Sequence, residues 1–261
     1  MGVSRRVKEH NYYEHESFQI AKDKIIGKSH NHKGIGTLSE KTVHAVLKNF
    51  YEPDEDYHEV ALEGYFADIY NENNDRGIIE IQTRSFNKLR NKLEVFLKLY
   101  KVTVVYPMPY NKWVGWIDDE TGEISPLRKS PRHFTMYDAF FELYKIKDYL
   151  KNPNLRLELV LMDMEEYKRL NGWNETKKRG ATRYDRIPLG IDEIIKVERP
   201  EDYMQFVPFE LEEEFTSAEF AKAARIPKER ATLVLNILNE IGTVRRMGRR
   251  GRSYLYMVKE D

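Results

Sequence analysis

The sequence predicts an α/β fold: a mixed β-sheet flanked by helices, followed by a small α+β domain at the C-terminus. Three observations support this prediction. Residues 78–106 contain an apolar strand, an amphipathic helix and a second strand in succession, which implies a right-handed crossover between two parallel strands. A hairpin pattern precedes them over residues 57–73. Two helical patterns and a basic hairpin end the chain over residues 215–258.

The first predicted helix covers residues 38–50, where apolar side chains recur at helical spacing. Ser39 is its predicted N-cap. Glu40 shares a face with Val43 and Leu47. We therefore expect the carboxylate of Glu40 to point toward the core side of the helix.

A hairpin is predicted next, with strands over residues 57–64 and 65–73. Glu63-Gly64 joins the two strands and is typical of a hairpin turn. The polar segment "NENNDRG" then predicts a second turn before the next strand.

The third strand is "IIEIQ" (residues 78–82), and a helix follows it from Phe86 with Ser85 as the predicted N-cap. Residues 102–107, "VTVVYP", form a continuous β-branched run, a pattern typical of a strand buried on both faces. This spacing predicts that the third and fourth strands run parallel.

The rest of this region is predicted from simpler signals. We expect a hairpin around residues 120–122, a helix over 135–150 and a strand over 155–163. Residues 171–186 lack periodicity and are predicted to form an exposed loop. Residues 187–208 contain three prolines and are predicted to connect to a second domain.

The C-terminal segment predicts a compact domain. Helices are expected over residues 215–224 and 226–242, with Gly242 at the end of the second, and a glycine-tipped hairpin over 243–258. Between residues 222 and 259 there are ten Lys and Arg residues against two Glu. The chain as a whole has 43 basic and 43 acidic residues, so its neutral total hides a basic C-terminal region.

Composition excludes several functional classes. The chain has 261 residues and no cysteine, which rules out disulfides, thiolate zinc sites and cysteine nucleophiles. No apolar signal region stands at the N-terminus, and no stretch approaches the roughly 18 apolar residues of a membrane span. The sequence therefore predicts a soluble cytoplasmic protein.

Glu80 is unusual because it lies within an apolar strand. Residues two apart in a strand stand on the same face about 6.6 Å apart, so Glu80 and Gln82 share a face. Asp68 lies in the preceding strand, and Glu40 lies on the first helix. If these elements meet, three carboxylates and one amide converge, which is a ligand set suited to a magnesium-like ion. The alternative is that Glu80 pairs with a neighbouring cation, for which Arg76 and Arg84 are candidates.

The segments "GYFADI" and "GIIEIQTRSFNKLRNKLEVF" resemble the PD-(D/E)xK nuclease superfamily, which has the restriction-endonuclease-like fold. The resemblance covers roughly residues 36–106 and implies an αβββαβ core with a mixed sheet. It implies that Asp68 and Glu80 hold Mg²⁺ or Mn²⁺ and that Glu40 is the helix glutamate. The backbone carbonyl of Ile81 is a further candidate ligand. Gln82 stands where the family usually has a catalytic lysine.

Two departures from the family pattern are present. Ala67 replaces the proline before the aspartate, and Gln82 replaces the lysine. Some restriction endonucleases with this fold carry Gln at the corresponding position. The alternative function is a non-catalytic DNA-binding regulator built on a degenerate nuclease scaffold, and an RNA-processing enzyme is a third reading.

The last 50 or so residues, about 209–258, resemble a winged helix-turn-helix domain. In such folds the second helix enters the major groove and the wing touches the DNA backbone. Basic side chains at the helix start and in the wing are therefore candidate DNA contacts, namely Lys228, Arg230, Arg245, Arg246, Arg249, Arg250 and Arg252. Basic residues of the predicted loop are further candidates for tracking the backbone, namely Lys177, Lys178, Arg179 and Arg183.

Together these features predict a nuclease domain over residues 1–186 with a core at about 36–165, a linker over 187–208 and a winged helix over 209–261. The predicted activity is metal-dependent hydrolysis of DNA by an endodeoxyribonuclease. We expect DNA as the partner, Mg²⁺ or Mn²⁺ as the metal, no small-molecule cofactor and no membrane association. A homodimer is compatible with this prediction.

Overall fold

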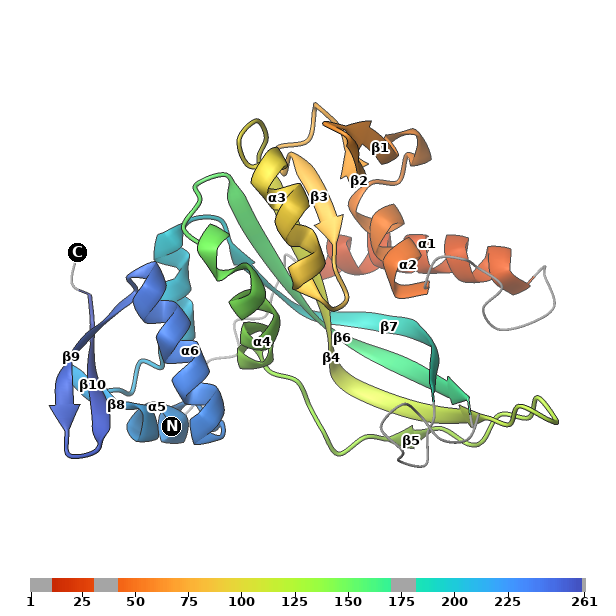
Figure 1. Ribbon diagram of the computed structural model, residues 1–261. Coiled ribbons are helices and arrows are strands. Elements are labelled where there is room, and N and C mark those ends of the chain that lie inside the picture. The colour runs from red at the N-terminus through yellow and green to blue at the C-terminus, as the bar shows by residue number, and fades with distance from the viewer. Residues whose placement is uncertain (1–10, 31–41, 170–181, 260–261) are drawn as a thin grey trace. The chain divides into compact units, whose positions relative to one another are not determined.

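The structure, a computed structural model, describes residues 11–30, 42–169 and 182–259 (Figure 1). It is a mixed α/β protein with a seven-stranded mixed sheet and a separate three-stranded sheet. The chain divides into two compact units. Unit 1 comprises residues 1–58, 109–133 and 162–192, and unit 2 comprises residues 59–108, 134–161 and 193–261. The predicted α/β class is confirmed at this level.

Unit 2 contains most strands of the mixed sheet. Its elements are β1 (His58–Leu62), β2 (Tyr65–Tyr70), β3 (Ile78–Ile81), the 3-10 helix η2 (Phe86–Leu89), α3 (Arg90–Phe96), the first part of β4 (Val102–Ile117), η3 (Met136–Ala139), α4 (Phe140–Leu143), η4 (Tyr144–Tyr149), the first part of β6 (Leu155–Arg169), the last part of β7 (Thr182–Val197) and η5 (Pro200–Phe206). The strands lie in the order β1-β2-β3-β4-β6-β7. β2 pairs antiparallel with β3, and β3 pairs parallel with β4. The predicted parallel pair is confirmed.

Gly77 fixes the point at which β3 begins. The amide of Ile78 donates to the carbonyl oxygen of Lys101 at 2.9 Å, which aligns β3 with β4. Gly77 has a φ of +69°, and a Cβ at this position would lie 2.2 Å from the same carbonyl oxygen. Only glycine fits this close approach without moving the backbone.

The helix predicted from Phe86 begins differently from the prediction. Ser85 has a left-handed backbone with a φ of 60° and makes no side-chain capping hydrogen bond. The carboxylate of Glu142, from α4, instead accepts a hydrogen bond from the amide of Phe86 at 2.8 Å. The first turn, η2, is a 3-10 helix, and α3 follows it. A distant carboxylate thus takes the role that the sequence assigned to a local serine.

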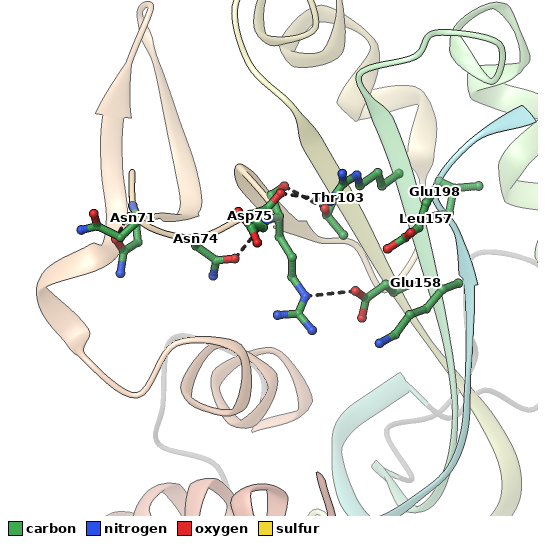
Figure 2. A pocket seen from close by; sticks show the side chains of 11 residues that line it. Asn71, Asn74, Asp75, Thr103, Leu157, Glu158 and Glu198 are labelled. Atoms are coloured by element: carbon green, nitrogen blue, oxygen red, sulfur yellow. Dashed lines mark hydrogen bonds and ion pairs between the residues drawn. The ribbon is translucent and has the colours of Figure 1, made fainter. Parts of the chain in front are cut away.

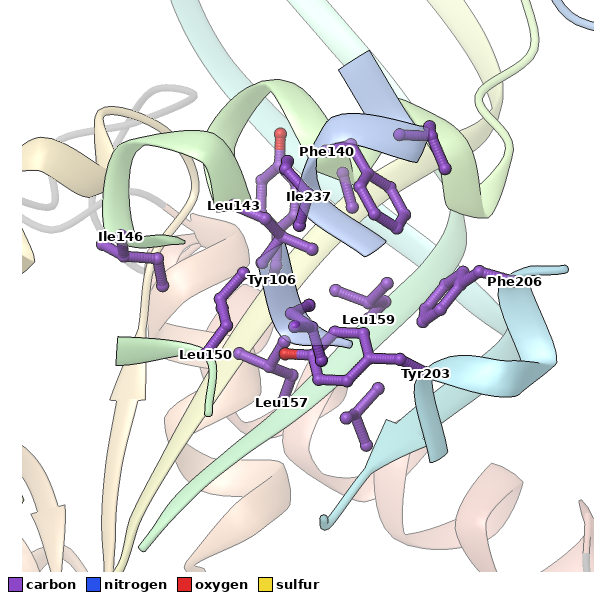
Figure 3. Close-up of a cluster of buried hydrophobic side chains, with 14 of the residues drawn as sticks. Tyr106, Phe140, Leu143, Ile146, Leu150, Leu157, Leu159, Tyr203, Phe206 and Ile237 are labelled. Atoms are coloured by element: carbon purple, nitrogen blue, oxygen red, sulfur yellow. The ribbon is translucent and has the colours of Figure 1, made fainter. Parts of the chain in front are cut away.

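The core of unit 2 joins sheet and helices (Figure 3). Leu157 and Leu159 of β6 contribute to it from the sheet, and Phe140 and Leu143 contribute from α4. The buried aromatic rings of Phe140 and Phe206 meet edge to face with their centroids 5.1 Å apart. Burying large apolar side chains of this kind stabilises the fold by roughly 1.5–3 kcal/mol each.

The segments predicted as a loop and a linker contain regular structure. Residues 182–197 form β7, and residues 200–206 form η5. Four of their aliphatic and aromatic side chains are buried, namely Ile195, Val197, Tyr203 and Phe206. The early part of β7 was missed because its buried positions are occupied by Asp185, which is 6% exposed, and Pro188, rather than by β-branched or aromatic side chains.

Unit 1 contains α1 (Asn11–His30), α2 (Thr42–Tyr51), the 3-10 helix η1 (Glu55–Tyr57), β5 (Arg128–Lys129) and the remaining parts of β4, β6 and β7. α1 packs on α2, and β5 pairs antiparallel with β4. The helix predicted over 38–50 is confirmed from Thr42 onward, while Ser39 and Glu40 lie outside the described residues. Asp185 of β7 accepts hydrogen bonds from the amide and hydroxyl of Thr42 and so caps α2.

The C-terminal part of unit 2 contains β8 (Glu214–Thr216), α5 (Ser217–Ala223), α6 (Lys228–Ile241), β9 (Val244–Arg250) and β10 (Ser253–Val258). Both predicted helices and the predicted hairpin are confirmed, and the three strands lie in the order β8-β10-β9. The hydroxyl of Thr216 accepts the amide of Glu219 in a capping box that starts α5. Gly242, with a φ of 99°, ends α6. Within the described residues, no helix combines the length and apolarity needed to span a membrane.

Candidate functional site

The candidate site forms where β2 and β3 separate. The two strands pair through Ile69 opposite Ile79. Beyond this pair, the amide of Ile81 donates instead to the Asp68 side chain, with 2.7 Å between nitrogen and Oδ2. Asp68 is half-buried. The carboxylate therefore replaces a backbone partner at the end of the ladder.

Glu80 stands beside Asp68 and is almost entirely buried, with 2% of its surface exposed. Its carboxylate accepts a hydrogen bond from the backbone of Asp68. The Lys92 amine of α3 donates to both of its oxygens, at 3.0 and 2.9 Å. Lys92 also donates to the carbonyl oxygen of Phe66 at 2.6 Å. The two carboxylates and the amine are thus linked through three elements: β2, β3 and α3.

Burial dominates the electrostatics of Glu80. It raises the pKa of Glu80 from 4.5 to about 7, repulsion from Asp68 adds to the rise, and the Lys92 amine opposes it. Lys92 therefore offsets only part of the desolvation penalty. A carboxylate that loses and gains its proton near neutral pH is a common feature of functional sites.

Lys92 is the residue that sequence reasoning missed. Lys92 explains how the apolar strand accommodates a carboxylate, because its amine forms an ion pair with Glu80. The cation that pairs with Glu80 is therefore neither Arg76 nor Arg84, the two predicted candidates. A signal was available: Lys92 lies three residues after Leu89 and four before Phe96, at the edge of the buried stripe of the helix. A lysine in that position is directed toward the sheet.

Other predicted site residues have separate positions. The side-chain NH₂ group of Gln82 donates to the carbonyl oxygen of Arg84, which ties it to the turn after β3. Glu40 lies outside the described residues. Within the described ranges, no group of three or more His, Cys, Asp and Glu side chains is placed to hold a metal ion. Asp68 and Glu80 would therefore need a backbone carbonyl, such as that of Ile81, and water to complete a coordination shell.

A polar cavity of about 480 Å³ lies at the start of β3 and β4 (Figure 2). In it the guanidinium of Arg76 pairs with the buried carboxylate of Glu158 at 3.1 Å. The hydroxyl of Thr103 donates to the carbonyl oxygen of Arg76, and Arg156 donates to that of Asp75. Arg76, Thr103 and Arg156 are thus held by contacts within the lining. Asp68 and Glu80 are the stronger candidate site.

The basic residues of the C-terminal hairpin occupy different environments. Arg246 and Arg249 both lie close to the ring of Tyr254, with their guanidinium carbons 4.0 and 4.9 Å from its centroid. Arg250 pairs with Glu219 at 3.1 Å. Two further wing arginines, Arg245 and Arg252, are exposed.

The helix preceding the hairpin presents less basic surface than predicted. Lys228, the first residue of α6, is exposed. Arg230, in contrast, pairs with the buried carboxylate of Asp138 at 3.1 Å, and its side chain is only 19% exposed. α6 contacts α4 and η4. Arg230 therefore links α6 to η3 within unit 2.

Of the four basic residues predicted in the loop, three lie outside the described residues, namely Lys177, Lys178 and Arg179. The fourth, Arg183, is in β7 and pairs with the buried carboxylate of Glu166 at 3.1 Å.

Fold and site together describe an α/β protein with a mixed sheet and an acid–acid–lysine cluster at the end of two strands. The chain belongs to a protein family described as a domain of unknown function (DUF8091), whose model matches residues 41–198. It is 26% identical over 169 residues to an uncharacterized protein of Treponema pallidum (strain Nichols). The match covers 65% of this chain and 64% of that relative's length. No solved structure matches the chain.

Proposed function

We propose that the protein is a metal-dependent nuclease that hydrolyses phosphodiester bonds in DNA. The observation that carries this proposal is the cluster of Asp68, Glu80 and Lys92, in which two neighbouring carboxylates meet one amine at the end of β2 and β3. Two acidic groups and one basic group are the elementary requirements for holding a cation and a phosphate side by side.

The fold supports the finer proposal of a restriction-endonuclease-like core. A strand pair that is antiparallel, β2 with β3, is followed by α3 and by β4 parallel to β3. This is the strand and helix order that the resemblance of "GYFADI" and "GIIEIQ" implies. Asp68 and Glu80 occupy the strands on which that family carries its metal carboxylates.

The donor chemistry fits a hard divalent cation. Asp68 and Glu80 would hold Mg²⁺ or Mn²⁺, with the carbonyl of Ile81 as a further oxygen ligand. When bound, such an ion lowers the pKa of a coordinated water and neutralises charge on the phosphate. The repulsion between buried Glu80 and half-buried Asp68 favours this role, because a bound cation would relieve the repulsion that adds to the effect of burial on the pKa of Glu80.

Lys92 supplies the positive charge that Gln82 lacks. In the structure the Lys92 amine donates hydrogen bonds to both carboxylate oxygens of Glu80, and 24% of the Lys92 side chain is exposed. Its flexible stem allows the amine to turn from Glu80 toward a phosphate oxygen when a metal ion neutralises the carboxylate. Gln82 could orient water or phosphate through its amide once its bond to Arg84 opens.

We further propose that the C-terminal domain is a winged helix that holds DNA mainly through its wing. The helix–helix–hairpin order supports the fold, and the exposed Arg245, Arg249 and Arg252 support phosphate contacts. The burial of α6 against α4 and η4 opposes entry of that helix into a major groove without rearrangement.

Single-turnover cleavage tests the proposal directly. Supercoiled, linear and single-stranded DNA are incubated with Mn²⁺ and the wild type, and with Asp68→Ala, Glu80→Ala and Lys92→Ala. We expect each substitution to slow cleavage by about 100-fold or more, because each removes a group that meets charge in the transition state. Matched controls are Glu94→Ala and Lys98→Ala, which remove exposed charges on or just after α3.

The alternative is a non-catalytic DNA-binding scaffold, and metal binding separates the two. A nuclease site requires Mn²⁺ to raise the melting temperature of the wild type but not that of Asp68→Ala. If the wild type shows no cleavage and no metal-dependent stabilisation, the nuclease proposal is refuted.

A further inference from the structure

Unit 1 contains a buried carboxylate surrounded by cations. Glu166, on β6, is 1% exposed. Four basic side chains from three strands approach its oxygens: Arg186 at 2.8 Å, Arg183 at 3.1 Å, Lys112 at 3.2 Å and Lys168 at 3.6 Å. We call these five residues the Glu166 cluster.

The cluster carries more positive charge than Glu166 neutralises. Counting only Arg186, Lys112 and Lys168, three positive charges meet one negative charge, which leaves +2 (3 − 1) before Arg183 is added. A single buried carboxylate is balanced by one cation, and each additional cation repels the others.

The pKa values of Glu166 and Lys112 reflect both their burial and the neighbouring cations. Burial by itself raises the pKa of Glu166, but Arg186 and then Lys112 and Arg183 outweigh it and hold the pKa at about 2. Burial lowers the pKa of Lys112; Glu166 opposes that shift, while Arg186 and Lys168 reinforce it. Burial is thus the largest cause of the lowered pKa of Lys112, and the two neighbouring cations add to it.

The cations remain accessible to a ligand. The exposed fractions of the side chains are 18% for Lys112, 29% for Lys168 and 35% for Arg183. Glu166 itself is buried, while these three cationic side chains are partly exposed. Trp116 follows Lys112 by four residues in β4, so the two side chains lie on the same face of the strand. The amine of Lys168 lies 5.3 Å from the Trp116 ring centroid, so an aromatic surface borders the cations.

We propose that the Glu166 cluster binds the phosphate backbone of a nucleic-acid strand, with Trp116 available to stack on a base. A polyanion offsets the surplus charge that the described residues of the cluster carry. Phosphates held by a basic groove next to an aromatic ring are typical of single-strand binding. Glu166 acts as a positioning residue, because it orients the four cations without contacting the ligand.

This site is independent of cleavage at Asp68 and Glu80, so it is tested in EDTA, where no metal-dependent reaction occurs. A fluorescein-labelled single-stranded oligonucleotide is titrated at several salt concentrations, and its anisotropy reports binding. The test variant is Lys112→Gln/Lys168→Gln, which keeps much of each aliphatic stem. The control is Lys98→Gln/Lys151→Gln, which removes two exposed lysines of unit 2.

We expect the test variant to bind about 10-fold more weakly at about 0.1 M salt and its salt slope to fall by about 1.4, or 0.7 per lost single-strand contact. The control should retain wild-type affinity and slope. If the test variant keeps the wild-type affinity and the wild-type salt dependence of binding, the proposal is overturned, and the cluster has only a structural role as a network of ion pairs.

Thermal stability supplies a second criterion. Removing surplus cations relieves repulsion, so we expect the test variant to melt at or above the temperature of its control. If the double variant instead fails to fold, Arg183→Gln decides, because this side chain is the most exposed of the four. Its salt slope should then fall by about 0.7, and an unchanged slope overturns the proposal.

Discussion

Glu80→Gln isolates the energetic consequence of burying a carboxylate in β3. The side chain of Glu80 is 3% exposed, and its pKa rises from 4.5 to about 7 despite the neighbouring Lys92. Because the pKa of Glu80 is higher in the folded than in the unfolded protein, the folded protein binds more protons than the unfolded protein at pH values between these two pKa values. The free energy of unfolding therefore falls as the pH rises through this range. At about 1.36 kcal/mol per pKa unit, this group lowers the free energy of unfolding by about 3 kcal/mol between about pH 4.5 and pH 8.

The glutamine variant has no proton to lose at this position, so it escapes that penalty. We expect the difference in unfolding free energy, Glu80→Gln minus wild type, to grow by about 3 kcal/mol in favour of the variant as the pH rises from about 4.5 to 8. Most of the change falls between the two pKa values. Taking the difference removes contributions from groups that titrate equally in both proteins.

Urea unfolding at a series of pH values measures this difference. Glu94→Gln is the control, because Glu94 is an exposed carboxylate on α3, and its difference from the wild type should stay flat. A flat or reversed profile for Glu80→Gln would refute the reasoning, because it would mean that Lys92 keeps Glu80 ionised throughout. Adding Mn²⁺ at about pH 8 should stabilise the wild type more than the glutamine variant if Glu80 is a metal ligand.

Three further outcomes are expected. Gly77→Ala should lower the free energy of unfolding by about 3 kcal/mol in urea, because its Cβ would lie 2.2 Å from the Lys101 carbonyl oxygen at a φ of +69°; an unchanged midpoint would show that the backbone shifts freely. Thr216→Ala should cost about 1 kcal/mol in the same assay by removing the α5 cap, whereas Thr216→Ser should cost little. Arg249→Ala/Arg252→Ala should reduce the salt slope for duplex DNA by about 1.8, or 0.9 per phosphate contact, and an unchanged slope would remove the wing from the DNA interface.

Local patterns predicted the elements around the candidate site well. The apolar run of Ile78, Ile79 and Ile81 placed Glu80 in β3, and the crossover rule predicted that β3 and β4 run parallel. The strand order also predicted that Asp68 and Glu80 could approach, as they do in the structure. These inferences depend on spacing along one chain segment and on the pairing of neighbouring segments.

Inferences that depend on distant partners were less successful. The pairing of Glu80 with Lys92 depends on where α3 packs, which periodicity does not specify. Glu142 replaces the predicted Ser85 cap from a segment 57 residues away (142 − 85). The strand after residue 181 was missed because buried Asp185 and partly buried Arg186 are held by hydrogen bonds and an ion pair instead of apolar contacts. Buried polar side chains conceal strands from patterns based on hydrophobicity.

The burial of α6 decides how the C-terminal domain could meet DNA. Ile237 of α6 lies in the same core as Phe140 and Leu143 of α4 (Figure 3). Arg230 is held by Asp138, which also accepts the amide of Thr135 at 2.9 Å in the cap of η3. Removing Arg230 from this contact would break an ion pair to a buried carboxylate, which costs several kcal/mol.

Major-groove reading by α6 would therefore require both the core and this ion pair to open. Contact through the exposed hairpin requires neither. If the domain binds DNA, phosphate contacts by the wing should dominate, and affinity should depend strongly on salt and weakly on sequence. A binding preference for one DNA sequence that disappears with Lys228→Ala would contradict this reasoning, because Lys228 is an exposed basic residue at the start of α6.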